Sequence, residues 1–594
     1  MVHISRLIVR NFRGIENADI HFREGLNVLV GRNGSGKSSV LHAIRLLFDS
    51  SLSNQQRILE ESDVYGDVGF GKPANVVIAA KLSGFDDAVR QDRANRLVFK
   101  VAEEHSAWIV YWFRPKASVR VALADKTRDK SLLNRDDYDY ERLVRFTADP
   151  TELEWDDAVK CDELRERELS ALTISDVPAL RDVVEAIRRE RTSPLARLLD
   201  TFDVPKQDRD AVQQAYLDAQ KVVEGVTAFS DLAREVLDTY EALTQEDRVT
   251  FRLGVSPPSF SAIRRGLGIL ISDSAVSDME LHRNGLGLNN LLFIAMLLRR
   301  FDRGARRAAS PILLFEEPEA HLHPQAQSGV MGELIQRRLQ TIVTTHSPYV
   351  AMSGGLDAVI NLDRADAVKG SRLSMSAGFT DAEIDDLERF LSLDRGTTMF
   401  ARTILLVEGP SERILIGAYA RVRGVNLSRL GVQVCSIDGI HFGAYEKLFG
   451  PNGLNKRRVS VRDGDAQNGP ERKLLPLFDD GSNTETVDPD RFVTACTLEY
   501  ALTQFAAIPA LLRAIIPYGE PTLVETLRQV HGPADVTGEL QRSMLRAIIR
   551  IGKARFAQSF AREIISHNLE APAYIDEAIT RVVRGSEATA IERA

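Results

Sequence analysis

Residues 26–48 decide the fold of the N-terminal part, and they read LNVLVGRNGSGKSSVLHAIRLLF. Leu26–Val30 is a short apolar run typical of a buried strand, whereas Val40–Phe48 has the spacing of a helix. Between them, residues 31–38 form a complete G-x-x-x-x-G-K-S phosphate-binding motif. A loop between a strand and a helix N-terminus turns its backbone N–H groups toward phosphate oxygens. The stretch therefore predicts a nucleotide-binding α/β domain.

The side chains of this loop have separate predicted roles. Lys37 is placed to reach the β- and γ-phosphates, and the Ser38 hydroxyl is placed to ligate Mg²⁺. The full set of loop residues predicted to contact the nucleotide is Asn33, Gly34, Gly36, Lys37, Ser38 and Ser39.

Composition excludes several classes of protein. With 594 residues, 44% hydrophobic and 27% charged, the chain is neither collagen-like, nor of low complexity, nor disordered. Its longest apolar stretch, Leu291–Leu298, is far shorter than the ~20 residues that cross a bilayer, and the N-terminus has no signal-peptide core. Cys161, Cys435 and Cys496 show no paired spacing, so a cytoplasmic, reducing location is expected. The net charge of −8 means that any nucleic-acid binding must be local.

Two further strands carry polar residues at their ends. Residues 312–318, ILLFEEP, form an apolar strand that ends in Glu316 and Glu317. Next to a phosphate-binding loop, Glu316 is expected to hold Mg²⁺ and Glu317 to activate the water that attacks the γ-phosphate. Residues 341–348, TIVTTHSP, deliver His346 as a predicted γ-phosphate sensor. Between the phosphate-binding loop and the Glu316 strand, Gly285, Gly287 and Asn289 form a glycine turn at a helix N-terminus that suits the γ-phosphate of a second nucleotide.

A second group of acidic residues lies in the C-terminal third. Glu408 and Glu412 follow the strand at 403–407, and Asp463 and Asp465 follow the strand at 458–462. Carboxylates at the ends of neighbouring parallel strands supply the hard oxygen ligands that Mg²⁺ or Mn²⁺ prefers. Glu499 is a further candidate metal ligand, and Lys553 is a candidate for neutralising charge in the transition state.

Changes in the sequence pattern, from strand-like and glycine-rich to helical, predict the domains of the chain. The nucleotide-binding part occupies 1–165 and 246–370, and a helical insertion occupies 166–245. That insertion is either a helical layer on the nucleotide-binding part or a dimerisation arm, and its apolar stripes flanked by charge favour the arm. After a boundary near 370–395, residues 395–594 form a second α/β domain with C-terminal helices.

The order of these motifs resembles known families. The P-loop, glycine signature, Glu-Glu strand and histidine resemble the ABC-type ATPases of the SMC and RecF kind, and the C-terminal group resembles the TOPRIM domain. The fusion, with VEGPSE, DGD, TLEY and GKARFAQ in that order, resembles the OLD (overcoming lysogenization defect) family of bacterial ATP-dependent nucleases over nearly the whole chain. The TLEY stretch and the length resemble class 2, the kind similar to the Gabija nuclease subunit.

The resemblance implies an α/β protein with an ABC/SMC-like P-loop ATPase, an inserted helical dimerisation segment, and a TOPRIM domain with helical C-terminal elements. It implies ATP with one Mg²⁺ (or Mn²⁺), two further ions in the TOPRIM site, and DNA as the substrate. It also implies a homodimer or higher homo-oligomer in which Gly285, Gly287 and Asn289 complete the partner's nucleotide site. The signature serine of transporters is missing, so Asn289 or Asn290 would substitute for it. A UvrD-like helicase is an implied partner.

Three functions remain open from the sequence. The first is a metal-dependent, ATP-regulated DNA endonuclease in antiphage defence or DNA processing, with DNA held near the metals by Lys456, Arg457, Arg458 and Arg472. The second is a RecF-like DNA-repair ATPase whose TOPRIM domain binds DNA without cutting it. The third, strand passage or primer synthesis, lacks an evident domain with a nucleophilic tyrosine.

Overall fold

The structure is a computed structural model. It describes residues 2–66, 70, 73–85, 108–144, 146, 148–159, 161–165, 168, 172–177, 194–199, 202–228, 231–232, 234–237, 267, 269–272, 279–280, 285–305, 310–362, 368–370, 372–391, 395–439, 442–463, 491–493 and 497–591.

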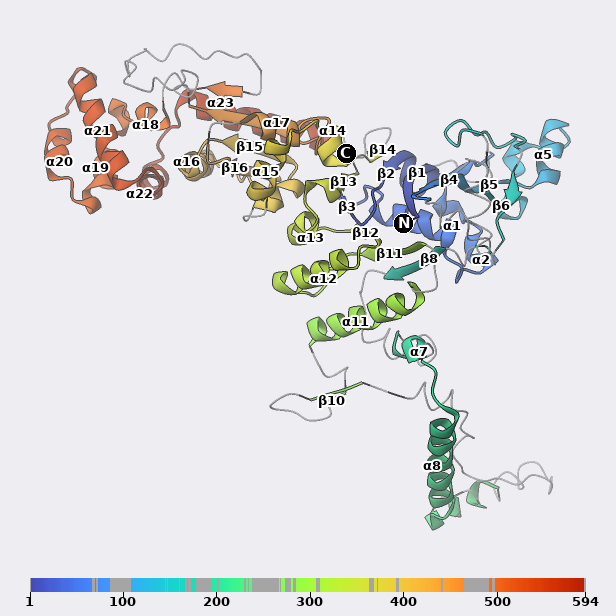
Figure 1. The fold of residues 1–594 in the computed structure, drawn as a ribbon. Coiled ribbons are helices and arrows are strands. Elements are labelled where there is room, and N and C mark those ends of the chain that lie inside the picture. Colours follow the sequence, from blue (N-terminus) through green and yellow to red (C-terminus); the bar gives the residue numbers. More distant parts are fainter. Residues whose placement is uncertain are drawn as a thin grey trace.

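A parallel sheet forms the centre of the N-terminal half (Figure 1). Its order is β13 (Val359–Asn361), β3 (Leu26–Val30), β12 (Gln340–Thr344), β11 (Ser310–Glu316) and β8 (Leu172–Val177). Every residue of β3 and β12 is buried, as expected for parallel strands that are covered on both faces. Because all five strands run the same way, the phosphate-binding loop, Glu316 and His346 follow their strands at the same edge.

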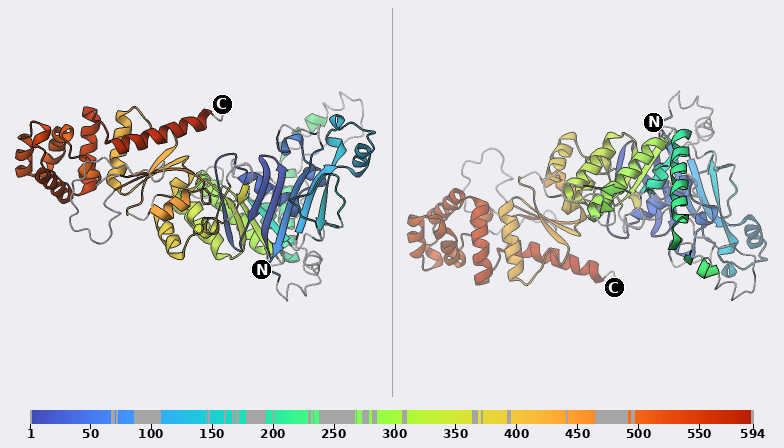
Figure 2. Two further views of the ribbon diagram at one scale, coloured as in Figure 1. Left: turned by 90° about the horizontal axis from the view of Figure 1, so that it is seen from above. Right: turned by 90° about the horizontal axis from the view of Figure 1, so that it is seen from below.

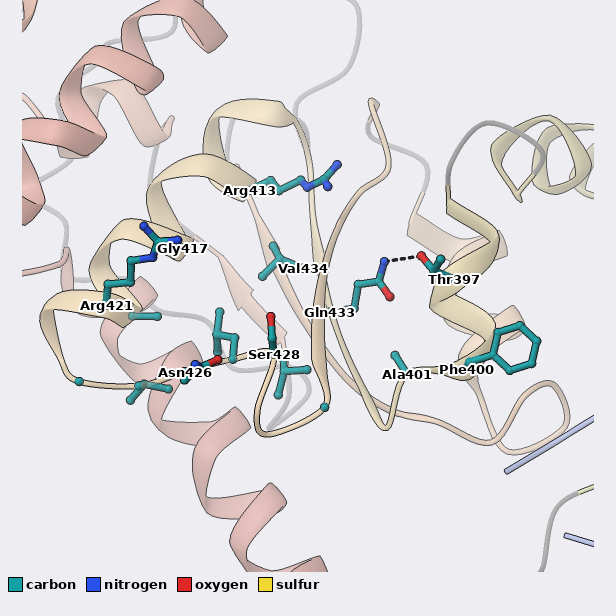
Figure 3. A pocket seen from close by; sticks show the side chains of 16 residues that line it. Thr397, Phe400, Ala401, Arg413, Gly417, Arg421, Asn426, Ser428, Gln433 and Val434 are labelled. Carbon is teal, nitrogen blue, oxygen red and sulfur yellow. Dashed lines mark hydrogen bonds between the residues drawn. The ribbon is translucent and has the colours of Figure 1, made fainter. Parts of the chain in front are cut away.

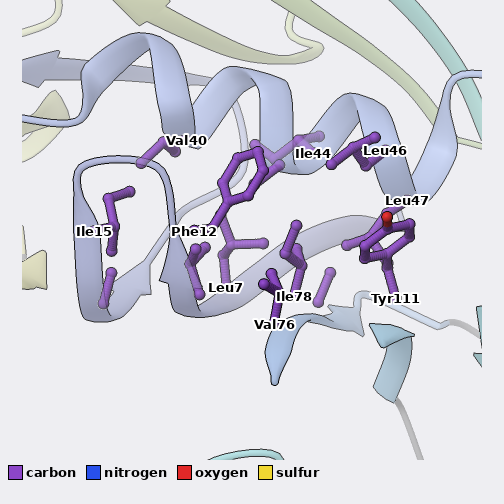
Figure 4. Close-up of a cluster of buried hydrophobic side chains, with 14 of the residues drawn as sticks. Leu7, Phe12, Ile15, Val40, Ile44, Leu46, Leu47, Val76, Ile78 and Tyr111 are labelled. Carbon is purple, nitrogen blue, oxygen red and sulfur yellow. The ribbon is translucent and has the colours of Figure 1, made fainter. Parts of the chain in front are cut away.

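A mixed sheet packs beside the parallel one. Its order is β14 (Val368–Gly370), β2 (Ile15–His21), β1 (His3–Phe12), β4 (Val76–Ser83), β5 (Trp108–Pro115), β6 (Tyr138–Val144) and β7 (Asp162–Glu163). Helix α1 (Lys37–Phe48) lies between the two sheets. Figure 4 shows Val40, Ile44 and Leu47 of α1 packing toward Leu7 and Ile78 of the mixed sheet. This packing fixes the helix whose N-terminus closes the phosphate-binding loop.

Other elements surround these sheets. They are α2 (Asn54–Arg57), η1 (Glu61–Asp63), α5 (Ala117–Ala124), η2 (Lys130–Leu132), η3 (Arg135–Asp137), α7 (Pro194–Leu199), α8 (Lys206–Glu224), β9 (Leu270–Ile271), β10 (Met279–Glu280), α11 (Leu286–Ala305), α12 (Pro324–Gln336), α13 (Pro348–Met352) and η6 (Leu356–Ala358).

The segment predicted as a helical insertion, residues 166–245, is corrected at its start. Strand β8 lies within it and pairs in parallel with β11, so the sheet extends past residue 165. Six residues between polar flanks are too few for apolar spacing to separate a strand from a helix. Beyond β8, helix α8 stands away from both sheets, and nearly all its described side chains are exposed (Figure 1). Helix α8 is therefore no layer on the sheet, while dimerisation through it stays a prediction.

The structure describes only part of the apolar stripes predicted for the insertion. Leu232 and Val236 are described and exposed. The stripe residues Leu180, Val184, Ile187, Phe229, Tyr240 and Leu243 lie outside the described residues.

The C-terminal half contains a second parallel sheet. Its order is β16 (Val432–Ser436), β15 (Thr403–Val407), β17 (Arg457–Arg462) and β18 (Arg491–Val493). All of β15 is buried: Ile404 and Leu406 join the core on one face, and Leu405 and Val407 join the core on the other. Glu408 therefore stands at the end of a central strand.

The C-terminal half contains further helices. They are α14 (Leu373–Ser376), α15 (Asp381–Phe390), η8 (Gly396–Phe400), α16 (Pro410–Val422), α17 (Phe442–Phe449), α18 (Leu498–Ala501), η10 (Phe505–Ala507), α19 (Ile508–Ile515), η11 (Ile516–Tyr518), α20 (Pro521–Arg528), η12 (Pro533–Asp535), α21 (Gly538–Ile551), α22 (Lys553–His567) and α23 (Ala573–Ile591). Figure 2 shows α23 running back from the outer helices along the sheet toward the N-terminal half. It packs against β15, β17 and β18.

One hydrophobic core joins the two halves. It contains Val28 and Phe315 from the first parallel sheet and Leu406 from the second. The predicted boundary region, 370–395, contributes Leu387 to the same core. This segment is therefore packed structure between the halves and not an exposed linker. Among the described residues, no helix is both long and apolar enough to span a membrane.

The burial of His42 in α1 predicts a pH-dependent stability. Burial, followed by the charges of Arg13 and Arg45, lowers the pKa of His42 to about 4. Its ring stacks on Phe12 with the centroids 5.9 Å apart. In the unfolded chain His42 takes up a proton near pH 6.5, whereas in the native state it stays neutral at that pH. Stability is therefore complete above this pH and is lost as pH falls from there toward 4, by about 2 kcal/mol between about pH 7 and pH 5.

We expect His42→Gln to remove this part of the pH dependence. The measurement is urea unfolding followed by tryptophan fluorescence, because Trp108, Trp112 and Trp155 are the only tryptophans and all lie in the N-terminal part. An equal loss of stability in wild type and variant between the two pH values would contradict the assignment.

Candidate functional site

The phosphate-binding loop adopts the predicted geometry. Gly34 and Gly36 have φ values of 75° and 95°, and these left-handed conformations favour glycine. Lys37 begins α1, and its Nζ donates hydrogen bonds to the carbonyl oxygens of Gly31 at 2.9 Å and Arg32 at 3.0 Å. Burial lowers the pKa of Lys37 to about 8, although the charges of Glu317 and Glu319 oppose the shift. A buried ammonium in such a loop is a binding partner for phosphate.

The remaining loop residues take different positions. Asn33 and Gly34 are exposed on the loop, whereas Ser39 is half-buried in α1. No contact of these residues singles out a role for their side chains, so their part in nucleotide binding stays a prediction.

Glu316 and Glu317 stand at the end of β11 beside this loop. The Ser38 hydroxyl donates a hydrogen bond to Glu316 Oε1. A hydroxyl and a carboxylate in direct contact are oxygen donors of the kind that Mg²⁺ requires beside a nucleotide, so the residues present fit that ion. Glu317 has a left-handed φ of 47°, and its backbone N–H donates to the Thr344 carbonyl oxygen at 2.9 Å. The backbone turn thus separates the directions of the two carboxylates.

His346 lies at the end of the next strand. Burial and the charge of Lys37 lower its pKa, so the imidazole is neutral near pH 7. The structure therefore gathers the loop, the two glutamates and the histidine as predicted from the sequence.

Glu319 is a residue whose role the sequence analysis missed. Its Oε1 accepts hydrogen bonds from the backbone N–H groups of His346 at 2.7 Å and Ser347 at 3.2 Å. Its Oε2 is buried and has no hydrogen-bond partner. Glu319 therefore fixes the backbone that carries His346. The only signal in the sequence was a third carboxylate two residues after Glu317, which alone does not predict such a contact.

The predicted signature residues at the start of α11 pack against Ala320 and His321, which follow β11. Helix α11 begins at Leu286, and a Cβ added to Gly287 would come within 3.1 Å of the His321 carbonyl oxygen. Asn289 is fully buried, and Asn290 donates a hydrogen bond to the Ala320 carbonyl oxygen. The expectation that either asparagine serves a second copy is corrected, because both side chains are buried in their own chain. Gly285 is exposed at the helix start, and its role stays a prediction.

The acidic residues of the C-terminal half converge at one edge of the second sheet. The backbone N–H of Asp463 donates to Glu408 Oε2 at 3.2 Å, and Asp463 Oδ1 accepts from the Leu498 N–H at 3.0 Å. Strands β15 and β17 are neighbours, so their carboxyl ends deliver these two side chains together. We call Glu408, Glu412, Asp463 and Glu499 the acidic cluster.

Burial makes this cluster electrostatically costly. The pKa of Glu412 is raised to about 6, first by burial and then by the charges of Glu499 and Glu408. Glu412 Oε2 accepts a hydrogen bond from the Gly409 N–H at 3.0 Å, which orients it at the start of α16. Like charges that raise one another's pKa are stabilised by a nearby cation.

Lys553 supplies one cation to the cluster. Its Nζ donates to Glu499 Oε2 at 3.0 Å. Burial acts to lower the pKa of Lys553, but the charges of Glu499 and Asp463 outweigh it, so the net pKa is raised. Lys553 therefore stays protonated and half-exposed beside the carboxylates, as its predicted role requires.

The donor set fits Mg²⁺ or Mn²⁺ in kind, because it consists of carboxylate oxygens. Glu499 Oε1 is buried without a hydrogen-bond partner, as expected for an atom that awaits a cation. Within the described residues, however, no three His, Cys, Asp or Glu side chains are close enough to form a metal site. The predicted ligand Asp465 lies outside the described residues. The described carboxylates therefore supply part of a ligand set, and Asp465 stays a predicted further ligand.

The predicted DNA-holding bases are corrected. Lys456 is buried, and Arg457 donates to the Arg581 carbonyl oxygen at 3.2 Å. Arg457 and Arg458 begin β17, whereas Asp463 follows its end, so about six residues, or ~20 Å of strand, separate them. The two ends of a strand lie at opposite edges of the sheet, so these bases lie at the edge away from Asp463. The short separation of the bases and Asp463 in the sequence did not show this. Arg472 lies outside the described residues.

A cavity of about 980 Å³ lies elsewhere on the second sheet (Figure 3). It runs along edge strand β16 and is lined by Arg413, Arg421 and Gln433, and Gln433 donates to Thr397 Oγ1 at 2.8 Å. Strand β15 separates β16 from β17 and Asp463. This cavity is therefore distinct from the acidic cluster.

A ring contact joins the nucleotide site to the segment that enters the second sheet. The ring of His346 lies 6.3 Å from that of Phe400, measured between centroids. Phe400 ends η8, which leads into β15 and Glu408. Gly396, also in η8, approaches Pro348 so closely that an added Cβ would come within 2.8 Å of the proline Cβ. The segment after His346 thus packs on the segment that enters the second sheet.

Comparisons with known proteins match the N-terminal and C-terminal parts of the chain to different domain families. Residues 3–166 and 202–351 match the AAA ATPase domain family, and residues 399–465 match the overcoming lysogenization defect protein-like TOPRIM domain. The retron Ec83 probable ATPase of Escherichia coli is 24% identical over 399 residues, which cover 59% of this chain and 69% of that protein. The DNA replication and repair protein RecF of Vibrio atlanticus is 41% identical over 98 residues, which cover 14% of this chain and 27% of that protein.

Among solved structures, the C-terminal region of the Burkholderia pseudomallei OLD protein is 33% identical, with a TM-score of 0.25. The match covers 32% of this chain and 99% of that one. The predicted fold class, an α/β P-loop ATPase followed by a TOPRIM domain, is confirmed. Because the ATPase match spans more than half of its residues, the chain belongs to the AAA ATPase domain family, and it carries an OLD-like TOPRIM domain after the ATPase part.

Proposed function

We propose that this protein is an ATP-regulated, divalent-metal-dependent DNA endonuclease. The observation that carries the proposal is the convergence of Glu408 and Asp463, whose contact of 3.2 Å joins the ends of two neighbouring strands. The OLD-like TOPRIM match covers both residues and supports the same reading.

Bound Mg²⁺ or Mn²⁺ would supply the activation of water and the stabilisation of the leaving 3′ oxygen. The chain's own part is to hold the ions through Glu408, Asp463, Glu412 and Glu499, with Asp465 as a further expected ligand. Lys553, charged and half-exposed, neutralises negative charge that develops on the phosphate. The AAA ATPase part binds and hydrolyses ATP, with Lys37 on the phosphates, Ser38 and Glu316 holding Mg²⁺, and Glu317 as the base.

The wider setting rests on the family resemblance. A role in antiphage defence or DNA processing, a homodimer or higher homo-oligomer, a UvrD-like helicase partner, class 2 membership and similarity to the Gabija nuclease subunit remain parts of the proposal. The helix α8, exposed along its described length, supports an assembly role for the insertion.

We predict that Asp463→Ala reduces nicking of supercoiled plasmid by about 100-fold or more, because it removes a ligand from the cluster. The assay compares Mg²⁺ and Mn²⁺, with and without ATP. Glu383→Gln is the control, since that carboxylate is paired with Lys447 Nζ at 2.7 Å outside the cluster. Unchanged nicking by Asp463→Ala would remove this residue from the reaction.

A second function is favoured by the RecF similarity: a DNA-repair ATPase whose TOPRIM domain only binds DNA. It is distinguished by the same plasmid assay together with a DNA-binding measurement. If wild type binds DNA without nicking it under every metal condition, and Glu408→Ala binds equally well, the second function replaces the first.

We predict that Glu319→Ala lowers the rate of ATP hydrolysis by about 10- to 100-fold, because the backbone of His346 loses its anchor. ATP affinity should change little, whereas Lys37→Ala should abolish ATP binding. Glu319→Gln retains an acceptor oxygen and should restore part of the rate. The matched control is Glu333→Gln, an exposed carboxylate paired with Arg337 on α12. A normal rate in Glu319→Ala would exclude the anchoring role.

We predict that Phe400→Ala removes the effect of ATP on nicking. The ring contact of Phe400 with His346 connects the nucleotide site to the segment that enters β15, so its loss should bring nicking with and without ATP to within about twofold. ATP affinity and the nicking rate without ATP should persist. Phe379→Ala is the control, because Phe379 packs against the same core. An ATP effect of wild-type size in Phe400→Ala would refute this path.

A further inference from the structure

Tyr574 occupies an unusual position beside the acidic cluster. It lies in the first turn of α23, which packs against β15 and β17, the strands that deliver Glu408 and Asp463. Its side chain belongs to the hydrophobic core on that face of the sheet, and only 7% of the residue is exposed. The hydroxyl oxygen is buried and has no hydrogen-bond partner.

The carboxylates of the acidic cluster act electrostatically on Tyr574. Burial raises the pKa of its phenol well above the usual value, and the carboxylates of Asp463, Glu412 and Glu499 raise it further. Tyr419, a neighbouring buried tyrosine on α16, differs: burial alone raises its pKa. Of these two phenols, Tyr574 is the one that senses the acidic cluster.

Two buried groups near this cluster thus lack partners at the same time. The Tyr574 hydroxyl is a donor without an acceptor, and Glu499 Oε1 is an acceptor without a donor. A buried polar group without a partner destabilises the fold, and folded proteins keep few such groups. A phenylalanine would fill the same core position without this penalty. The hydroxyl therefore calls for a role outside the stability of the metal-free fold.

We propose that Tyr574 is a positioning residue for the acidic cluster, whose hydroxyl donates a hydrogen bond to a cluster carboxylate when a divalent cation is bound. This inference rests on the proposed metal-dependent function. A carboxylate that ligates a metal ion is oriented by a hydrogen-bond donor on its other oxygen. The hydroxyl supplies that donor without adding charge. Because it is buried, it acts through the carboxylates and does not touch DNA.

The test is Mn²⁺ binding to the full-length protein without nucleotide, measured by isothermal titration calorimetry. Wild type, Tyr574→Phe, Tyr419→Phe and Asp463→Ala are compared, and binding lost in Asp463→Ala defines the cluster sites. Tyr574→Phe should weaken this binding by about 10-fold, as loss of a supporting hydrogen bond does at metal sites. Tyr419→Phe should bind as wild type does.

The thermal stability of the metal-free protein separates positioning from packing. Because the hydroxyl has no partner there, Tyr574→Phe should melt at the wild-type temperature or above it. Wild-type Mn²⁺ affinity in Tyr574→Phe overturns the inference, and so does a lower melting temperature that accompanies weaker binding. If wild type itself shows no binding that depends on Asp463, the metal-dependent function fails, and the inference fails with it.

Discussion

Strands buried on both faces can carry functional polar groups only where they end. Every residue of β3, β12 and β15 is buried, so these strands offer no surface for a ligand along their length. In a parallel sheet the carboxyl ends meet at one edge, and the loops that follow are free to turn toward a ligand. Both candidate sites obey this constraint, one after β3, β11 and β12 and the other after β15 and β17.

The two edges differ in charge. At the first, a buried lysine is the central group: the pKa of Lys37 falls to about 8 because its ammonium has lost water and gained only part of the compensating charge. At the second, carboxylates dominate, and the pKa of Glu412 rises to about 6. Phosphate would relieve the first site and a divalent cation the second. The fold thus stores an electrostatic preference at each edge that matches the ligand proposed for it.

Groups that lie next to a strand end in the chain were predictable from the sequence. Glu316, His346 and Glu408 lie at the ends of short apolar strands or within two residues of them, so strand direction brings them to the ligand. Lys37 begins the helix after the loop that follows β3, and the loop motif marks it. Roles that depend on the turn itself were not predictable. Glu319 reaches the backbone of His346 only after the left-handed turn at Glu317, and no spacing rule contains that angle.

Other predictions were wrong because the orientation of a side chain depends on segments that are distant in the sequence. Asn289 has the spacing of a signature residue, but in α11 its side chain is fully buried within its own chain. Arg457 and Arg458 are close to Asp463 in sequence, yet the strand between them carries them to the opposite edge. Tyr574 comes from a distant helix, and nothing in its local sequence marks it. Local patterns predict which residues a strand ends with, but not what is packed over them.

The position of Phe400 constrains how the two edges can communicate. Phe400 contacts His346 on one side and continues through η8 into β15 on the other. Strand β15 is hydrogen-bonded to both β16 and β17, so it cannot slide alone without breaking two ladders. A displacement at Phe400 must therefore move the whole second sheet as a body, against a close-packed core shared by both halves. Such a movement would carry Glu408 and Asp463 together with helix α23 and its Tyr574, because α23 packs on β15 and β17. Coupling of this kind alters where the acidic cluster lies relative to the N-terminal half and leaves its individual ligands intact.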